Sequence, residues 1–315
     1  MNPSLLPEET LQALATAIIT CPICHSGSSS TNSLVEGQGI WSKIKCTSCS
    51  KDFEIAEAVD KLFANNGRSC YSLWANGSQV VKQAICEPGK STLIDVKGIF
   101  EEIYSINHSF IGQAKYLAGG LSTHFIPQGY IMVSVAPNKN GETYPIHVIV
   151  DIEGRKHAEP KLAPWQQMLL RAKLNLFSAP QLTVIMALSA VDLYVEELTN
   201  SELQTIGKKG RPELWSYHIN KRLNLKLRTI LGKRDFVLTE KFVQTRNALA
   251  HRGNYLVKLP EDIRQKEEEW LENGKYREGT GNYSPCAHFA LSAALKIIRN
   301  CRRIAEDQTV GKKQG

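Results

Sequence analysis

The stretch CPICHSGSSSTNSLVEGQGIWSKIKCTSC, residues 21–49, decides the fold at the start of this chain. It contains two CxxC pairs with 21 residues between them. Each CxxC turn presents two thiolates from one tight knuckle, and two knuckles complete a tetrahedral sulfur site. Four thiolates leave a zinc ion no open coordination position, so the pattern predicts one structural Zn²⁺ and no metal-assisted hydrolysis. The predicted ligands are Cys21, Cys24, Cys46 and Cys49.

This segment resembles a zinc ribbon over about residues 18–57. The spacing is slightly longer than the usual ~15–20 residues, and the Ser- and Gly-rich loop after Cys24 can absorb the excess. His25 could replace one cysteine as a ligand, and a redox dithiol is the alternative interpretation of a CxxC pair. Zinc ribbons occur in many unrelated proteins, so the resemblance says little about function.

The composition is that of a soluble globular protein. The chain has 315 residues, of which 42% are hydrophobic and 22% are charged, and this length allows two or three domains. No run of about 18 apolar residues is present, so we expect no membrane-spanning helix. The N-terminus carries Glu8 and Glu9 and lacks a basic first region, which argues against a secretory signal. We therefore expect a cytoplasmic protein with buried thiols at Cys70, Cys86, Cys286 and Cys301.

The net charge of +7 is unevenly distributed. Residues 1–155 carry 11 Lys and Arg against 14 Asp and Glu, which gives −3. Residues 156–315 carry 27 against 17, which gives +10. We therefore expect a partner with phosphates, such as RNA, to meet the C-terminal half. A basic surface that only aids solubility is an equal alternative on charge alone.

The hydrophobic pattern predicts an α+β chain of three domains. The first, residues 1–60, is the zinc ribbon with a leading helix from Leu5 to Thr20. The second, residues 61–155, has mixed α/β character with prominent strand signals and no chemical motif. The third, residues 156–315, is all-helical.

The clearest strand signal in the middle domain is a hairpin. Tyr130–Val135 and Ile146–Val150 are rich in β-branched residues, and Asn138–Gly141 supplies an Asn-Gly turn between them. Ser91–Val96 is a further short strand. The pattern therefore predicts that Tyr130–Val135 and Ile146–Val150 pair with each other.

From Pro164 onward, apolar residues recur at helical spacing. One core-facing stripe is Val184, Leu188, Val191, Val195 and Leu198. A second stripe, ended by Gly232, is Trp215, Ile219, Leu223, Leu227 and Ile230. A third helix is capped by Thr239 and stops near Gly253, and a polar, charged insert at residues 258–283 follows it. The last helix buries Leu291, Leu295, Ile298 and Cys301.

The segment RNALAH, residues 246–251, carries residues that suit RNA cleavage without a metal. The 2′-hydroxyl must lose a proton, the leaving 5′-oxygen must gain one, and the phosphorane charge must be stabilised. Histidine exchanges protons near neutral pH, and arginine donates paired hydrogen bonds to phosphate oxygens. On an ideal helix Arg246 and His251 are about 140° apart, whereas Asn247 and His251 share a face. The length of the arginine side chain can bridge that angle.

Arg246-Asn247, three residues and His251, followed by Arg252-Gly253, resembles the signature of the HEPN superfamily of helical-bundle domains. The likeness covers about residues 160–310. It implies that Arg246 and His251 are the catalytic pair, with Asn247 as their orienting neighbour. It also implies a homodimer with two motifs in one cleft and a metal-independent endoribonuclease of toxin–antitoxin or antiviral systems.

An earlier helix, residues 187–198, is similar to the HEPN helix that carries an acidic residue. Either Asp192 or Glu196 matches that position, and the two could equally be part of a solvated face. The charged insert after the motif departs from the family pattern and leaves the shape of the cleft open. Basic residues that could contact phosphate, or form a solvated surface, are Lys221, Arg222, Lys226, Arg228, Lys296, Arg299 and Arg303.

Two other functions compete with the nuclease. The zinc ribbon and middle domain could recognise RNA or protein while the helical domain only dimerises. Alternatively, a partner protein in a defence complex could complete the activity. Phosphate-loop, nucleophile-elbow and HExxH patterns are absent from the sequence, which leaves RNA cleavage as the enzymatic hypothesis.

Overall fold

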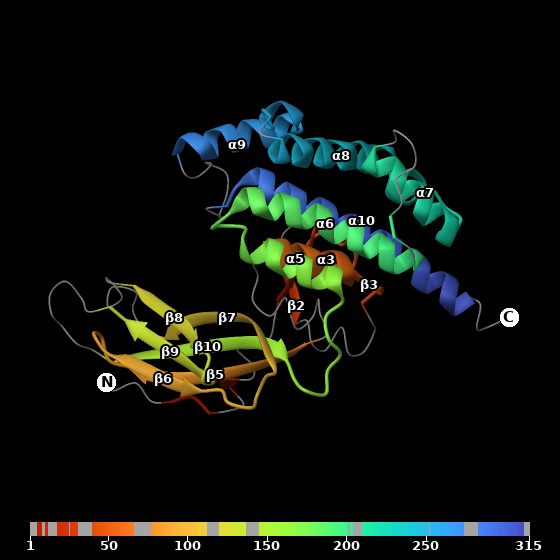
Figure 1. Ribbon diagram of the computed structural model, residues 1–315. Coiled ribbons are helices and arrows are strands. Elements are labelled where there is room, and N and C mark those ends of the chain that lie inside the picture. The colour runs from red at the N-terminus through yellow and green to blue at the C-terminus, as the bar shows by residue number, and fades with distance from the viewer. Residues whose placement is uncertain are drawn as a thin grey trace. The chain divides into compact units, whose positions relative to one another are not determined.

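The chain folds into two compact units, Met1–Lys161 and Leu162–Gly315. Figure 1 shows strands in the first unit and helices in the second, so the predicted α+β class is confirmed. No helix among the described residues is long and apolar enough to cross a membrane. This computed structural model describes residues 5–7, 10–11, 18–24, 26–30, 40–65, 77–111, 120–136, 145–200, 202–203, 210–251, 253–273 and 283–311.

Each CxxC pair lies between two short antiparallel strands. The first pair is flanked by β1 (Ile18–Thr20) and β2 (Gly27–Ser30), and the second by β3 (Lys43–Lys45) and β4 (Asp52–Glu54). Helix α3 (Ile55–Ala64) follows directly. Its buried face, which forms the local core, consists of Ile55, Ala56, Ala58, Val59, Phe63 and Ala64.

The predicted leading helix from Leu5 to Thr20 is wrong at its C-terminal end. Ile18–Thr20 is strand β1, paired with β2. Ile18 and Ile19 are β-branched, which favours an extended backbone, and pairing with β2 closes the turn that holds the first cysteines. Residues 12–17 lie outside the described residues.

Two three-stranded antiparallel sheets share one hydrophobic core. The first sheet has the order β5-β10-β7, with strands at Ser78–Cys86, Ile146–Arg155 and Glu102–Ile111. The second has the order β6-β9-β8, with strands at Ser91–Asp95, Tyr130–Val135 and Leu121–Ile126. Ile131 and Val133 of β9 belong to the same buried cluster as Val148 and Val150 of β10. The middle segment is therefore a small sandwich of two sheets.

The strands at Tyr130–Val135 and Ile146–Val150 are present, but the predicted hairpin between them is wrong. Strand β9 pairs with β6 and β8, and β10 pairs with β5 and β7. Placing the two strands in opposite sheets lets their apolar faces pack against each other, which a shared sheet would not allow. The predicted turn, Asn138–Gly141, lies outside the described residues. The predicted strand at Ser91–Val96 is confirmed as β6, with Val96 just beyond its end.

Strand β10 is buried along all ten of its residues. The face of its sheet that carries Ile149 is covered by the N-terminal segment, where Leu11 packs against Val81 and Ile149. Gln83 fixes this segment, because its side chain accepts from the Leu6 backbone N–H at 2.8 Å and donates to the Leu6 carbonyl at 2.8 Å. Each fully buried valine or isoleucine contributes about 1.5–3 kcal/mol, so the apolar residues of β10 contribute strongly to the stability of this unit.

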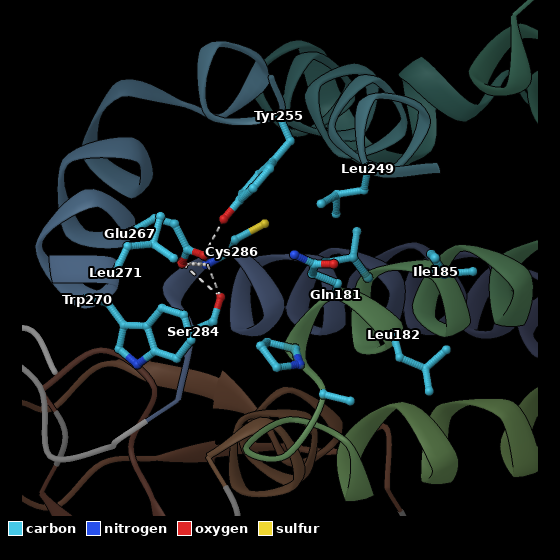
Figure 2. Close-up of a pocket in the computed structure, with 13 residues that line it drawn as sticks. Gln181, Leu182, Ile185, Leu249, Tyr255, Glu267, Trp270, Leu271, Ser284 and Cys286 are labelled. Carbon is cyan, nitrogen blue, oxygen red and sulfur yellow. Dashed lines mark hydrogen bonds between the residues drawn. The ribbon is translucent and has the colours of Figure 1, made fainter. Parts of the chain in front are cut away.

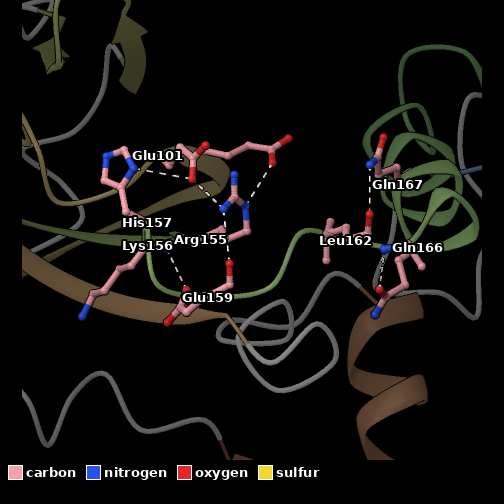
Figure 3. A network of polar contacts seen from close by, with 10 residues as sticks. Glu101, Arg155, Lys156, His157, Glu159, Leu162, Gln166 and Gln167 are labelled. Atoms are coloured by element: carbon pink, nitrogen blue, oxygen red, sulfur yellow. Dashed lines mark hydrogen bonds and ion pairs between the residues drawn. The ribbon is translucent and has the colours of Figure 1, made fainter.

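A buried arginine holds the end of β10, as Figure 3 shows. Arg155 Nη1 lies 2.6 Å from Glu101 Oε2, and its Nε lies 3.8 Å from Glu102 Oε2. Nη1 also donates to the carbonyl oxygen of Glu159 at 3.3 Å. The hydrogen bond from Arg155 lowers the pKa of Glu101, so the pair is ionised at neutral pH. An arginine that is only 5% exposed needs such partners, and they fix the chain where it leaves the sheet.

The second unit consists of helices in its described part. These are α5 (Pro164–Leu174), α6 (Pro180–Thr199), α7 (Arg211–Leu223), α8 (Leu227–Ala250), the short 3₁₀ helix η2 (Leu256–Lys258), α9 (Glu261–Asn273) and α10 (Pro285–Gly311). Helix α6 packs between α5 and α10 (Figure 1). The predicted α6 stripe is buried at Val184, Leu188, Val191 and Val195, and the predicted α10 stripe at Leu291, Leu295, Ile298 and Cys301.

The second predicted stripe belongs to two helices and not to one. Helix α7 ends at Leu223, and Asn224 follows with φ 55°, in the left-handed region that asparagine tolerates. A new helix begins at Leu227, whose backbone N–H donates to Ser216 Oγ at 3.1 Å. This hydrogen bond satisfies one of the free donors at the start of α8.

Gly232 ends the first helical segment of α8, as predicted, whereas Thr239 does not begin the next segment. Gly232 lies inside α8 with φ 79° and ψ 165°, where it marks a kink. Thr239 lies within the helix, and its hydroxyl donates to the Asp235 carbonyl at 3.0 Å. The predicted helix end near Gly253 is correct, because α8 stops at Ala250. The kink exists because glycine adopts this conformation without a Cβ penalty.

The predicted polar insert at residues 258–283 contains a helix. Glu261–Asn273 forms α9, and Glu267 on it is only 2% exposed. Residues 274–282 lie outside the described residues. The charged composition of this segment therefore describes one face of α9 and not the whole helix.

We expect Gly154→Ala to lower the free energy of unfolding by about 1–3 kcal/mol, because overpacking displaces backbone. A Cβ at Gly154 would meet the Glu102 carbonyl oxygen and lie 2.8 Å from Phe100 Cδ1. Gly253→Ala is the control, since the nearest atom there is 3.4 Å away. Urea denaturation of both variants measures the difference. Equal midpoints would contradict the packing at this strand.

Candidate functional site

The four cysteine thiols meet in one cluster. Their sulfur atoms all lie within 4.8 Å of one another. Cys21 Sγ is 3.8 Å from Cys49 Sγ, and Cys24 Sγ is 3.5 Å from Cys46 Sγ. Four sulfurs around one metal at about 2.3 Å are separated by roughly 3.8 Å in a tetrahedron. The cluster therefore fits one structural metal ion such as Zn²⁺, with the four predicted ligands.

The same backbone turn shapes both halves of the cluster. The Cys21 N–H donates to the Ser26 carbonyl at 3.0 Å, and the Cys46 N–H donates to the Lys51 carbonyl at 2.9 Å. In the second turn Ser50 adopts φ 57°. These hydrogen bonds join the strands on either side of each CxxC pair, so each turn aims two thiols the same way. His25, the alternative ligand, lies outside the described residues.

The pKa values of the thiols differ because backbone N–H groups, burial and the neighbouring thiols act on each of them differently. The backbone N–H of Cys49 is the main cause that lowers the pKa of Cys46. The Lys51 backbone N–H lowers the pKa of Cys49, but burial and the neighbouring thiols together raise it. One thiol thus ionises readily while another resists ionisation. A divalent cation would favour four thiolates, and its binding would release protons.

Asn247 and His251 lie at the exposed C-terminal end of α8. His251 follows the last helical residue, with φ −98° and ψ 14°. Its backbone N–H donates to the Asn247 carbonyl at 3.0 Å. Both side chains are exposed, so a ligand can reach the His251 imidazole. Arg252, the next residue of the motif, lies outside the described residues.

Arg246 is half-buried beside them. Its Nη1 donates to Asn247 Oδ1 at 3.2 Å, while its Nε is buried and has no hydrogen-bond partner among the described residues. In the described part of the chain, no hydrogen bond or ion pair joins Arg246 directly to His251. Asn247 is therefore the link, with its side chain on Arg246 and its backbone on His251.

Of the two acidic candidates on α6, Asp192 is the one whose carboxylate accepts hydrogen bonds from side chains of another helix. Its Oδ1 accepts from Trp215 Nε1 at 2.8 Å, and its Oδ2 accepts from Arg211 Nη1 at 3.1 Å. Burial raises the pKa of Asp192, and the charges of Arg211 and Arg246 oppose this effect. Asp192 therefore interacts electrostatically with the arginine of the RNxxxH motif.

Glu196 serves a different purpose. Its Oε1 accepts from the backbone N–H of Leu203 at 3.2 Å, in the segment after α6. The structure thus separates two residues that the sequence left equivalent. The contacts that distinguish Asp192 come from α7, 19 and 23 positions away in sequence. Trp215 belonged to a predicted core stripe, and its hydrogen bond has no signature in that pattern.

The predicted basic residues fall into two groups. Lys221 and Arg222 at the end of α7, and Lys226 and Arg228 near the start of α8, are exposed. On α10, by contrast, Lys296 Nζ lies 2.6 Å from Asp235 Oδ2, so a phosphate would compete with that carboxylate. Arg299 and Arg303 on α10 are half-buried. The exposed group near the α7–α8 junction is the better placed of the two for phosphate contacts.

A pocket that the sequence did not indicate lies in the helical unit, beside Leu249 of the motif segment. Its volume is about 560 Å³, and Figure 2 shows its walls. Helices α6, α8, α9 and α10 contribute to it, together with Tyr255. The buried carboxylate of Glu267 lines it, although the sequence predicted that residue to lie in a polar, charged insert. Spacing of Ile263, Glu267 and Trp270 on one helical face is the signal that could have indicated burial.

Comparisons of the chain with protein-family models, curated proteins and solved structures give no match. The four-cysteine cluster and the C-terminal helical unit therefore stand on their own geometry.

We expect the purified chain to hold one zinc ion, measured by elemental analysis, and Cys46→Ser to lose it because three thiolates bind zinc far more weakly. Cys86→Ala removes a buried thiol of β5 outside the cluster and should retain the ion. Chelation should unfold the strands around the cluster and leave the helical unit intact, as followed by circular dichroism. Full zinc content in Cys46→Ser would contradict this site.

Proposed function

We propose that this protein is a metal-independent endoribonuclease of HEPN type, acting in a toxin–antitoxin or antiviral setting. The observation that carries the proposal is Arg246-Asn247 with an accessible His251 at the end of a long helix, in a unit whose described part is helical. The charge of +10 on residues 156–315 supports RNA as the partner. We further propose that the ion in the four-cysteine cluster is Zn²⁺ and that its role is structural.

In the proposed reaction, an imidazole of His251 removes the proton from the RNA 2′-hydroxyl. The 2′-oxygen then forms a bond to phosphorus, and the bond from phosphorus to the 5′-oxygen breaks. A protonated imidazole supplies a proton to the leaving 5′-oxygen. The products are a 2′,3′-cyclic phosphate and a 5′-hydroxyl end, so no water or metal enters the step.

Arg246 would stabilise the negative charge that develops on the phosphoryl oxygens. Its guanidinium has donors to spare, because the one hydrogen bond that it makes in the described chain is from Nη1 to the neutral Asn247 amide. Asn247 orients this group and, through its carbonyl, the end of the helix that carries His251. Asp192 would contribute a negative charge that interacts electrostatically with the Arg246 guanidinium.

We propose that the helical unit forms a homodimer. One His251 cannot be both the deprotonated base and the protonated acid at the same moment, and two copies of the motif in one cleft supply both forms. A partner protein of a defence system could regulate the dimer.

We expect the purified protein to cleave a mixed RNA pool in EDTA and leave 2′,3′-cyclic phosphate ends. His251→Ala should reduce the rate by about 10²–10⁴-fold, because general acid–base catalysis is worth that much. His124→Ala is the matched control, since His124 is an exposed histidine on β8. Gel electrophoresis and end-group analysis measure both. Equal cleavage by the parent protein and by His251→Ala would contradict the proposal.

The two acidic residues of α6 provide a second test. We expect Asp192→Asn to reduce RNA cleavage by more than tenfold, about 1.4 kcal/mol, because it removes the charge near Arg246. Glu196→Gln is the matched control and should retain the parent rate, since Gln can still accept from the Leu203 N–H. Single-turnover rates of the two variants decide between them. A larger loss in Glu196→Gln would contradict the assignment.

The alternative function is RNA or protein binding without cleavage. It is favoured by one observation, namely that no described contact joins Arg246 to His251. The same assays separate the two functions. RNA binding that persists in His251→Ala, with no cleavage by the parent, would support the binding module.

A further inference from the structure

The pocket beside Leu249 has the size and the lining of a ligand site. Its volume of about 560 Å³ lies within the ~300–1,000 Å³ range of small-molecule sites. Leu182 and Ile185 of α6 and Leu271 of α9 give it apolar walls. Figure 2 shows Glu267, Ser284 and Cys286 gathered at one end. The pocket is therefore mostly apolar along its walls, where Gln181 is the polar exception among the residues that Figure 2 labels there, and polar at one end.

Glu267 is the centre of that polar end. Its side chain receives hydrogen bonds from three groups: Tyr255 Oη at 3.0 Å, Ser284 Oγ at 2.8 and 2.9 Å, and the Cys286 backbone N–H at 2.9 Å. The Ser284 hydroxyl has one proton, so these groups supply three protons in all. A carboxylate offers about four lone-pair sites. One acceptor site on Glu267 is therefore left for a further donor.

The charge of Glu267 also lacks a counter-ion among the described residues. Its three donors are neutral groups, and no lysine, arginine or histidine of the described chain forms an ion pair with it. Burial first, and then the Glu267 charge, raise the pKa of Tyr255 and of Cys286, so both remain protonated at neutral pH. A buried carboxylate is costly; the N–H group at the start of α10 offsets part of that cost, and a bound cation would offset more of it.

We propose that this pocket binds an organic ammonium ion with an apolar body. The ammonium group donates to the open acceptor site of Glu267, and the apolar body lies against Leu182, Ile185 and Leu271. The rings of Tyr255 and Trp270 line the same pocket and can attract the cation through their π faces. A carboxylate beside aromatic rings is a chemistry that selects ammonium ions.

Other ligand classes fit less well. An anion would meet the negative charge of Glu267 at close range. A neutral ligand could fill the volume and the acceptor site but would leave the charge uncompensated. This proposal does not rest on RNA cleavage, because it follows from Glu267 and its surroundings alone.

Three indole compounds of matched size test the charge preference by isothermal titration of the full chain. Tryptamine is a cation, tryptophol is neutral and indoleacetate is an anion at neutral pH. We expect tryptamine to bind with one site per chain, at least about tenfold more tightly than either of the others. Affinity for tryptamine no greater than for indoleacetate would overturn the proposal.

Variants locate the site. Leu182→Lys places a positive charge in the wall of the pocket, at a side chain that is 39% exposed, and should weaken tryptamine binding by at least about tenfold. Leu174→Lys is the matched control on α5, 57% exposed and outside the lining, and should bind as the parent does. Unchanged binding in Leu182→Lys would overturn the proposal. This pair does not require the buried glutamate to be replaceable.

Glu267→Gln tests the charge itself. In a folded variant, shown by an unchanged circular dichroism spectrum, tryptamine should lose its advantage over tryptophol, because the carboxamide keeps the shape without the charge. A tryptamine preference that survives in the folded Glu267→Gln protein would contradict the role of this carboxylate.

Discussion

Charged groups that leave water must find partners, and this constraint fixes both units of the protein. In the first unit Arg155 is buried at the end of the central strand and is held by two glutamates. In the second, Asp192 is held by Trp215 and Arg211, which ties α6 to α7. Glu267 ties α9 to the start of α10 through Ser284 and the backbone N–H of Cys286. The apolar core supplies most of the stability, and these polar contacts determine which elements meet.

Local patterns predicted what is decided locally. The metal cluster follows from two CxxC turns, because each turn aims its own thiols, and the α6 and α10 stripes follow from helical periodicity. Strand partners are decided at long range. β9 and β10 resemble a hairpin in sequence, yet each joins a different sheet because their apolar faces pack against each other. The break at Asn224 was missed because Trp215–Ile230 keeps its apolar spacing across a turn that asparagine permits.

In the candidate site of the helical unit, too, some features could be predicted from local sequence and others depend on distant residues. The chemistry of Arg246 and His251 can be inferred from a few adjacent residues, since side-chain type sets what each can donate or accept. The choice between Asp192 and Glu196 could not be inferred from the sequence, because it depends on Arg211 and Trp215 in another helix. The pocket was hidden for a further reason. A run of glutamates suggests a solvent-exposed helix, and the only local sign that Glu267 is buried was its spacing from Ile263 and Trp270 on one helical face.

A change in the bend of α8 at Gly232 moves the C-terminal end of the helix. The helix beyond it is roughly 27 Å long at 1.5 Å per residue, and Asn247 and His251 sit at its far tip. Around such an arm, a change of about 5° in the bend shifts the tip by roughly 2 Å. The backbone angles of one glycine thus govern where the imidazole stands, at a distance no side chain could span. A ligand or a second subunit that changed the bend at Gly232 would therefore move the His251 imidazole.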